Sequence, residues 1–333
     1  MTEVAVRSVD AAAWRQHLAT FDTVPLTADP DFLEVAARHS PGGRALYLVA
    51  EHGGAAAGGL AGLVRRHRGI DRLECSLEGT PGGPLLVPDP PAVEPAVTDA
   101  LGRHVAGMLR GRLALAALTP PGTGELVAEA PPAGWNAATY ESAVVDCRGG
   151  ADHVGQALWT NNRRNERNRG LKRGCTLQEE SRAEALAEWY PLYEAGAAGW
   201  SQAPLPQAML ADLLSACPGR VIFNTVRLDG RIIGGHVCLR WGDRLLAWQG
   251  GADPAVARTH FPTTLLYWQD IVWAADHGLA AVDFGGCVGR DSLRDFKRRC
   301  GAVFEPRVQL TARSPLGRLH GLMADARRRW RRR

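Results

Sequence analysis

The sequence lacks the features that would place it among disulfide-rich, fibrous or metal-dependent small proteins. It has 7 cysteines among 333 residues, and no two of them form a Cys-x-x-Cys pair. An odd number of thiols without metal-ligand spacing is typical of a reducing compartment, so we expect neither a disulfide framework nor a structural zinc site. The 38 glycines follow no triplet period, which excludes a collagen-like chain.

Long apolar runs are also missing. The first twenty residues contain no uninterrupted apolar core, and the most apolar stretch, residues 46–64, is rich in glycine and alanine and carries Glu51 and His52. Neither segment has the pattern of a secretory signal or of a membrane span. We therefore expect a soluble, cytoplasmic protein, whose length fits two domains of roughly 150 residues.

Several enzyme classes are disfavoured by missing motifs. The sequence contains no Gly-x-x-x-x-Gly-Lys-Ser/Thr phosphate loop, no Gly-x-Gly-x-x-Gly after a strand, and no Gly-x-Ser-x-Gly nucleophile turn. Its 10 histidines include no His-Glu-x-x-His pair, so no catalytic metal is expected.

The charge that is present is distributed unevenly. The whole chain carries +4, whereas residues 161–175 contribute +5 and residues 327–333 (RRRWRRR) contribute +6, which leaves −7 on the remaining 311 residues. A mildly acidic body with two basic patches is typical of a protein that meets a polyanion locally. A solvated helix face and an unbound tail would show the same charges.

Two halves of the chain share a coarse pattern of hairpin, strand, helix and strand. The first half has expected strands at residues 44–51, 55–64, 73–77, 85–87 and 113–118 and a helix at 93–109. The second half has expected strands at 220–228, 231–240, 244–249, 280–284 and 303–310 and a helix at 261–277. Between them lie a connector at 131–134, a strand at 139–146, and helical sequence at 152–169, 182–196 and 206–216.

This pattern predicts an α/β protein with two tandem domains, each a mixed twisted sheet flanked by helices. We expect residues 1–148 and 149–313 to form the two domains, followed by a basic helix or tail at 314–333.

The order of elements resembles the GNAT acyltransferase fold. In that fold, a Gln/Arg-x-x-Gly-x-Gly/Ala turn opens a helix and holds the coenzyme A pyrophosphate by backbone N–H groups. The corresponding residues 257–263 (ARTHFPT) contain no glycine. The resemblance therefore implies the fold without the usual cradle for acetyl-CoA.

Four stretches of the second half together resemble the Fem-type branch of that superfamily, the FemABX-like and FemAB/BioF2-like peptidyltransferases. They are the basic helix at residues 163–174, the hairpin at 228–254, the DFGG segment at 283–286 and the FKRRCGA segment at 296–302. The last is similar to the family's aromatic-Lys-x-x-aromatic-Gly signature, with Cys300 in place of the second aromatic residue. The match covers roughly residues 155–310, and the first half resembles the family's first domain only by position.

Members of this branch transfer an amino acid from aminoacyl-tRNA to an amine of a cell-wall precursor or of a small molecule. The resemblance implies aminoacyl-tRNA as co-substrate and no bound cofactor, and we expect a monomer. No long heptad segment provides the coiled-coil arm of some cell-wall members, so the version here is compact. The Ala-, Gly- and Arg-rich composition hints at a GC-rich bacterial genome, where antibiotic clusters are common, and a natural-product amine is the favoured acceptor.

Three other functions stay open. They are a peptidoglycan-precursor bridge aminoacyltransferase, an acyl-CoA-dependent N-acyltransferase, and a tRNA-binding protein without catalysis.

The resemblance places three residues in the reaction. Lys297 is expected near the ester carbonyl or the terminal phosphate-sugar, where a cation stabilises a developing oxyanion. Phe296 is expected to stack on the terminal adenine. Asp283 is expected to orient or deprotonate the acceptor ammonium, or else to cap the turn at residues 285–286.

The remaining candidate residues fall into two groups. His236 and Gln249 on adjacent strands, with Tyr267 on the following helix, are expected to line an acceptor pocket, and a satisfied polar network in the core is the alternative. A helix at 161–174 would stack like charges at i+3 and i+4 spacing, which is tolerable mainly where an anion faces them. The residues expected to bind tRNA are Arg163, Arg164, Arg167, Arg169, Lys172, Arg173, Arg298 and Arg299, and the tail at 327–333 is expected to add phosphate contacts or to be solvated.

Overall fold

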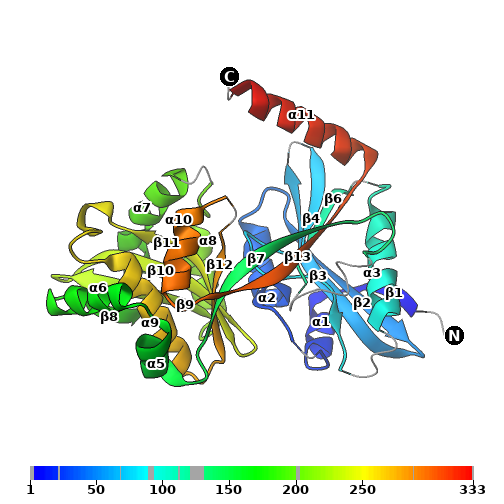
Figure 1. Cartoon of the computed structure of the whole chain (residues 1–333). Coiled ribbons are helices and arrows are strands. Elements are labelled where there is room, and N and C mark those ends of the chain that lie inside the picture. The colour runs from blue at the N-terminus through cyan, green and yellow to red at the C-terminus, as the bar shows by residue number, and fades with distance from the viewer. Residues whose placement is uncertain are drawn as a thin grey trace. The chain divides into compact units, whose positions relative to one another are not determined.

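The computed structural model describes residues 4–21, 23–67, 69–88, 94–111, 113–120, 131–199, 203–287 and 289–331. The chain divides into two compact units (Figure 1). Unit 1 comprises Met1–Tyr140 and Arg307–Arg333, and unit 2 comprises Glu141–Pro306. Each unit has its own run of parallel and antiparallel strands, its own core and its own flanking helices, which confirms the expected α/β architecture of two tandem domains.

The sheet of unit 1 has the strand order β1-β2-β3-β4-β6-β13, with β5 beside β3. Neighbours pair antiparallel except β4 and β6, which are parallel. The strands are β1 (Val4–Val9), β2 (Arg44–His52), β3 (Ala55–His67), β4 (Ile70–Glu74), β5 (Leu85–Leu86), β6 (Leu113–Leu118) and β13 (Val303–Arg313).

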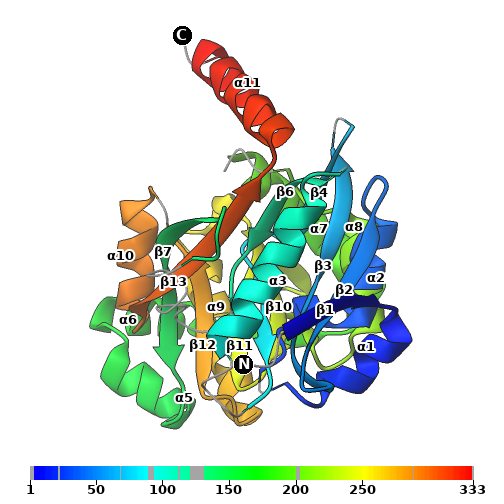
Figure 2. The ribbon, with the colours of Figure 1, turned by 90° about the vertical axis from the view of Figure 1, so that its right-hand side faces the viewer.

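Helices of unit 1 start where their sequence provides caps. The Asp10 carboxylate accepts from the N–H of Ala13 at 2.8 Å, and Asp29 caps the helix that begins with Pro30. Helix α3 (Glu94–Met108) lies across the unit 1 strands (Figure 2) and buries Leu101 in the core with Leu48 and Leu60 of the sheet. The helices are α1 (Ala11–Leu18), η1 (Leu26–Ala28), α2 (Pro30–Arg38), α3 (Glu94–Met108) and α11 (Pro315–Arg331).

The sheet of unit 2 has the order β7-β12-β11-β10-β9-β8. Its strands β8 to β11 form an antiparallel meander, whereas β11 and β12 are parallel and pair only at Arg244–Leu246 with residues 281–283. Beyond this short ladder the two strands continue without pairing to each other. The strands are β7 (Asn136–Asp146), β8 (Thr176–Glu180), β9 (Val221–Leu228), β10 (Arg231–Trp241), β11 (Arg244–Ala252) and β12 (Ala281–Gly286).

Two helices cover opposite faces of this sheet. A Cβ on Gly234 of β10 would meet Leu266 of α9, and a Cβ on the next residue, Gly235, would meet Trp189 of α7. Because adjacent residues of a strand point to opposite faces, α9 and α7 lie on different sides. The helices of unit 2 are α5 (Gly150–His153), the π-helical turn η2 (Val154–Leu158), α6 (Asn161–Lys172), α7 (Ala183–Gly199), α8 (Gln207–Ala216), the 3₁₀ turn η3 (Pro254–Val256), α9 (Pro262–Asp276) and α10 (Asp291–Arg299).

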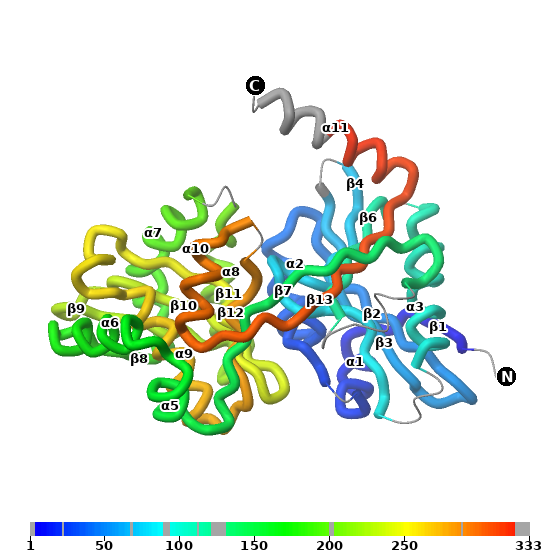
Figure 3. The backbone as a smooth tube through the Cα atoms, in the orientation of Figure 1, coloured from blue at the N-terminus to red at the C-terminus, as the bar shows by residue number. Residues whose placement is uncertain are grey.

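Two strands carry the chain between the units (Figure 3), and they change the expected domain boundaries. Strand β7 follows the first half in sequence but pairs with β12 and buries Ala143 and Val145 in the core of unit 2. Strand β13 follows the second half but pairs with β6 and buries Leu310 and Ala312 in the core of unit 1. The division therefore falls at residues 140/141 and 306/307 rather than at 148/149 and 313/314, because sheet pairing rather than chain order assigns these two strands.

The expected helix at residues 152–169 is interrupted in the structure. Thr160 is extended, with φ −67° and ψ 154°, and separates the π-helical turn from α6. Its backbone N–H donates to the carbonyl of Arg299 at 3.1 Å, so a contact with α10 sets the start of the basic helix.

Within the described part of the chain, none of the helices combines the length and the apolar composition that a bilayer crossing requires.

Candidate active site

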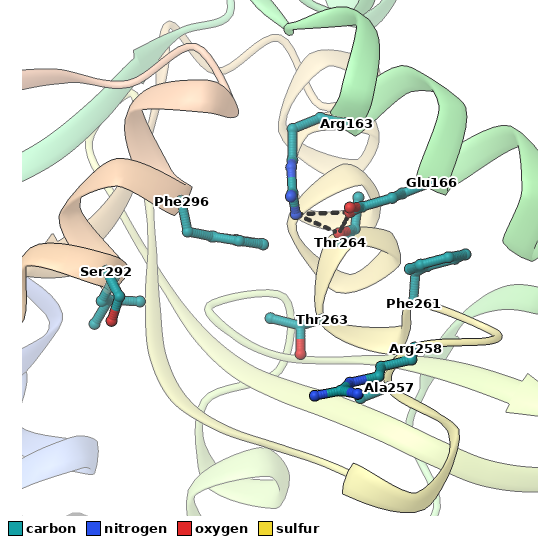
Figure 4. Close-up of a pocket in the computed structure, with 10 residues that line it drawn as sticks. Arg163, Glu166, Ala257, Arg258, Phe261, Thr263, Thr264, Ser292 and Phe296 are labelled. Atoms are coloured by element: carbon teal, nitrogen blue, oxygen red, sulfur yellow. Dashed lines mark hydrogen bonds and ion pairs between the residues drawn. The ribbon is translucent and has the colours of Figure 1, made fainter.

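A pocket of about 550 Å³ lies in unit 2 among α6, the first turn of α9 and α10 (Figure 4). Phe296 and Phe261 stand on opposite sides of it in this view, and Thr263 lies between them. The residues that line it are Arg163, Glu166, Ala257, Arg258, Phe261, Thr263, Thr264, Ser292, Leu293 and Phe296. The pocket thus combines guanidinium groups, hydroxyls and aromatic rings.

A polar triad, of which Thr264 is buried and the two charged residues are partly buried, forms one wall of this pocket. Arg163 donates to the Glu166 carboxylate at 2.6 Å and to the Thr264 hydroxyl at 3.2 Å, and that hydroxyl donates to Glu166 at 2.7 Å. The Arg163 guanidinium also lies 4.7 Å from the centre of the Phe296 ring. Among the described residues no partner exists for its buried Nε atom, so Arg163 keeps an unused donor beside the pocket.

The turn that opens α9 has an unusual backbone. Phe261 occupies the N-cap position in the left-handed region, with φ 54° and ψ 46°, a conformation that glycine adopts most easily. Pro262 follows at the first helical position and has no N–H to donate. The helix therefore offers the N–H groups of Thr263 and Thr264 to a ligand, but not the glycine-lined cradle of a pyrophosphate site.

The expected tRNA-binding residues of α6 differ in how far their charges are already engaged. Arg164 donates to the carbonyl of Gln156 and to the side chain of Asn161. Arg167 lies 4.2 Å from the Trp268 ring, and burial lowers the pKa of its guanidinium below the ordinary value.

The later turns of α6 are more exposed. Arg169 lies 5.2 Å from the Phe261 ring and Arg173 donates to the carbonyl of Thr259, while Lys172 faces solvent. These contacts tie α6 to the loop before α9.

Two further expected tRNA-binding residues lie on α10. Arg298 and Arg299 both pair with Asp295, at 3.0 and 2.7 Å. All three side chains are exposed, so these pairs are weak and can exchange for another anion.

Lys297 points into the protein rather than toward the pocket. It is 3 % exposed, and its amino group donates to the carbonyls of Phe284, Gly285 and Gly286 at 2.5, 3.1 and 3.1 Å. Burial lowers the pKa of this amino group, which nearby Cys287 and Asp283 partly offset. Its three donor directions are thereby used on the end of β12, so the geometry gives Lys297 a positioning role, and direct contact with a donor ester stays a prediction.

Asp283 holds the same strand end from the other side. Its Oδ1 accepts from the Ser142 hydroxyl at 2.5 Å and from the N–H of Gly285 at 2.8 Å. Gly285 has φ 73°, and the pairing of β12 with β7 shifts register between Asp283 and Gly286. This arrangement favours the turn-capping alternative over contact with an acceptor.

His236 belongs to a buried cluster that reaches three elements. Its Nδ1 lies 2.7 Å from Asp270 Oδ2, while Asp270 Oδ1 accepts from Asn224 at 2.8 Å and from the Cys238 thiol at 3.4 Å. Burial raises the pKa of that thiol well above its usual range. The structure therefore holds the imidazole in one orientation, with Nδ1 committed to the carboxylate.

The other imidazole nitrogen of His236 lies close to the backbone of Gly250 in β11. A Cβ on Gly250 would lie 2.8 Å from His236 Nε2. Gly250 lies on the part of β11 that does not pair with β12. Glycine at position 250 therefore lets β11 pass close to the Nε2 edge of the imidazole.

Tyr267 connects this histidine to the pocket. Its ring centre lies 5.4 Å from that of His236 and 5.1 Å from that of Phe296, which lines the pocket. Burial raises the pKa of the Tyr267 hydroxyl well above its usual range, so the phenol stays protonated.

Gln249 lies apart from His236 and Tyr267. It follows the alternation of β11, so its side chain points to the face opposite the one from which Gly250 meets His236. There its Oε1 accepts from the Tyr193 hydroxyl of α7 at 3.0 Å. The structure thus brings together two of the three expected acceptor residues and separates the third.

His236, Cys238 and Asp270 are also the set of described residues whose donor atoms lie close enough to hold a metal ion. Their present contacts are hydrogen bonds to one another at normal distances, which satisfies the group without an ion.

Asp270, Glu166 and Thr264 are site residues that no sequence motif indicated. A signal for Asp270 exists, because it is the one acid within the apolar helix LLYWQDIVW and stands three residues after Tyr267. Glu166 gives no such signal, because in the sequence it is one acid within a basic segment.

Comparisons with known proteins agree with the fold. Residues 160–298 match the family described as acetyltransferase (GNAT) domain. No curated protein matches the sequence.

Solved structures match nearly the whole chain at low identity. The structure of FemX superposes with a TM-score of 0.69 at 11 % identity, covering 91 % of this chain and 96 % of its own. A tandem GNAT protein from the clavulanic acid biosynthesis pathway gives 0.58 at 15 %, covering 93 % and 98 %. L-PGS from Bacillus licheniformis gives 0.55 at 15 %, covering 92 % and 98 %.

This protein has a tandem GNAT fold. The fold is defined by the strand order, by the parallel strands β11 and β12 that part after a short ladder, and by these superpositions. Within that fold its architecture is Fem-like, as the motifs of the second half implied.

Proposed function

We propose that this protein transfers an aminoacyl group from a charged tRNA to an amine and so forms an amide bond. The pocket at the first turn of α9 is the observation that supports this proposal most directly. It offers an aromatic ring for an unpaired base, guanidinium groups for phosphates and hydroxyls for ribose. The resemblance to Fem-type enzymes, which use this donor, supports the same assignment.

The backbone of the pocket argues against coenzyme A as the donor. A pyrophosphate bound at a helix N-terminus needs close approach to several backbone N–H groups. At this turn a phenylalanine stands where small residues would admit the phosphates, and Pro262 removes one N–H. A tRNA end, held by side chains and base stacking, requires no such approach.

We place the amine near His236. The amine nitrogen would attack the ester carbonyl carbon, forming the C–N bond while the C–O bond to the ribose breaks. His236 Nε2 would accept the proton that the amine loses and return it to the departing ribose oxygen. Asp270 holds the imidazole in the tautomer that leaves Nε2 free to do so.

The decisive experiment is incubation of the protein with a pool of labelled aminoacyl-tRNAs and a panel of amines, with loss of each ester measured. We expect one class of ester to be consumed only when an acceptor is present. At low acceptor concentration the rate should rise with pH across the neutral range, because an ammonium with a pKa near 8 or above 10 must first lose a proton. Consumption of acyl-CoA but of no tRNA ester would contradict the proposal.

The acyl-CoA-dependent N-acyltransferase remains the second candidate. The match to the acetyltransferase domain family favours it, and the related tandem GNAT structure is described as solved without AcCoA. Titration with acetyl-CoA, followed by calorimetry, separates the two donors. We expect weak binding of acetyl-CoA, because the turn that opens α9 lacks a glycine-lined pyrophosphate site.

For the acceptor, we favour a small natural-product amine in the cytoplasm over a peptidoglycan precursor. A tRNA-binding role without catalysis would appear as donor binding with no ester consumed under any acceptor.

A further inference from the structure

The outer face of α11 is apolar and exposed. Its side chains Leu316, Leu319, Leu322 and Met323 are between 54 and 68 % exposed, and they are four of the seven large apolar side chains that are exposed in the described part of the chain. Leu316, Leu319 and Met323 follow the i, i+3, i+7 spacing of one helix face. Such a contiguous stripe marks an interaction surface rather than scattered surface residues.

Small residues on the other face fix this orientation. A Cβ on Gly317 would collide with the carbonyl oxygen of Ala114 in β6, and a Cβ on Gly321 would lie 2.9 Å from the Arg313 guanidinium. The N–H of Gly317 also donates to the Ser314 hydroxyl at 3.1 Å. The helix therefore presents glycines to unit 1 and leucines to solvent, and it projects from the end of β13 in both ribbon views (Figures 1 and 2).

The sequence of this helix is strongly basic. Residues 315–333 contain seven arginines and one acid, Asp325, and end in RRRWRRR. The helix extends to Arg331. An apolar stripe is thus followed along the chain by a cationic segment that contains a tryptophan.

We propose that α11 docks in the plane of an anionic lipid bilayer surface. A helix with a leucine-rich face and arginines beside it inserts its apolar side chains at the acyl boundary while the cations meet lipid phosphates. The phosphates of an RNA would pair with the arginines, but an RNA would leave the leucine stripe exposed to water. A second copy of the helix would cover the stripe but would bring two basic segments onto one assembly. The inference concerns unit 1 alone and does not rest on the proposed transfer reaction.

Vesicle flotation with the full-length protein tests the proposal. We expect binding to vesicles of phosphatidylglycerol and phosphatidylcholine and little binding to phosphatidylcholine alone. Combined Leu316→Ser, Leu319→Ser and Met323→Ser should lower the partition on the order of 100-fold, because three apolar side chains lose their insertion. Replacing Arg327, Arg328 and Arg329 by Ala should lower it about fivefold per residue at low salt.

Val303→Ser provides the matched control. Val303 is 63 % exposed but lies on β13 rather than on α11, so its replacement should leave vesicle binding unchanged. Since all three substituted side chains are exposed, the thermal unfolding of the triple variant should equal that of the wild type, which separates loss of docking from loss of fold.

Four results would overturn the proposal. The first is equal binding to neutral and anionic vesicles, or none to either. The second is an unchanged vesicle partition in the triple variant. The third is a self-association that the triple variant abolishes, seen by sedimentation in the absence of vesicle binding, which would assign the stripe to a second copy. Loss of tRNA binding in the arginine variant with no loss of vesicle binding would likewise assign the basic segment to RNA.

Discussion

The amino group of Lys297 is held by the backbone of a neighbouring strand, and this contact decides what the residue can do. Three carbonyls at the end of β12 accept from it, and Asp283 binds the N–H of Gly285 in the same strand end. Together the two side chains fix the place where β11 and β12 stop pairing. Both residues thus hold the end of β12, and a contact of either one with donor or acceptor stays a prediction.

Lys297→Ala should lower the free energy of unfolding by about 3 kcal/mol, because buried carbonyls lose a charged donor. Turnover should fall with it, since the end of β12 loses its position. Denaturant unfolding and steady-state kinetics measure the two effects. Arg298→Ala, on the same helix but exposed and paired only with Asp295 in the described structure, is the control and should change stability by less than about 1 kcal/mol. A variant Lys297→Ala that keeps full stability but loses turnover would show that the lysine contacts the substrate.

His236→Gln should lower the rate of amide formation by roughly 10²- to 10⁴-fold and leave donor binding intact, because it removes the proposed base. Asp270→Asn should lower the rate as well, since the imidazole loses the partner that fixes its tautomer. Single-turnover rates and donor titrations check the split. Tyr193→Phe removes the hydrogen bond to Gln249 on the other face of the sheet and should leave the rate unchanged. Equal rates in wild type and His236→Gln would remove the histidine from the mechanism.

At the scale of secondary-structure elements, the wall of the pocket depends on how closely α6 approaches the turn before α9. A Cβ on Gly170 would lie 2.7 Å from the carbonyl oxygen of His260 and 2.8 Å from Leu265. Glycine is therefore required at this crossing, and the distance between the two helices determines where Arg163 meets Thr264.

Gly170→Ala should lower the free energy of unfolding by about 2 kcal/mol, because the added methyl group forces α6 and α9 apart. Donor affinity should fall in parallel, as the triad of Arg163, Glu166 and Thr264 spans this contact. The control is Gly107→Ala in α3, where a Cβ meets nothing within 4 Å, and it should stabilise by roughly 0.5 kcal/mol through helix propensity. Equal effects of the two substitutions on unfolding would contradict the close approach of α6 and α9.

At the scale of the whole molecule, two buried thiols make the free energy of unfolding depend on pH in the alkaline range. Burial raises the pKa of Cys147 and of Cys300 to about 12 from an ordinary value of 9.0. Between these values the unfolded chain loses the proton and the folded chain keeps it. The stability that each thiol contributes is thus complete below pH 9 and is lost as the pH rises toward 12.

The free energy of unfolding of the wild type should therefore fall more steeply between pH 9 and 11 than that of Cys300→Ala. The difference should be up to about 1.4 kcal/mol per pH unit. Denaturant titrations at several pH values give both slopes, and groups common to the two proteins, such as Lys297, cancel in the comparison. Parallel slopes would mean that Cys300 ionises equally in the folded and unfolded chains.

Much of the fold could be predicted because local patterns determine it. Alternating apolar residues and turn signals predicted most strands of both sheets, and Pro262 and Gly278 predicted the limits of α9 to within a residue or two. The tandem GNAT architecture and its likeness to the fold of FemX agree with the order of elements and with four motifs. The candidate site was harder to predict from the sequence, since a motif identifies residues but not the direction in which their side chains point.

The sequence by itself determined which elements form, where charge accumulates and which motifs lie at the end of β12 and in α6. Only the tertiary structure decided that β7 pairs within unit 2 and β13 within unit 1. It also decided that Gln249 and His236 face opposite sides of one sheet, and that Asp270 holds the histidine. The physical reason is the same in each case. Hydrogen-bond pairing between strands and the burial of charged groups depend on partners that are 34 or more residues away in the chain, and no local pattern carries that information.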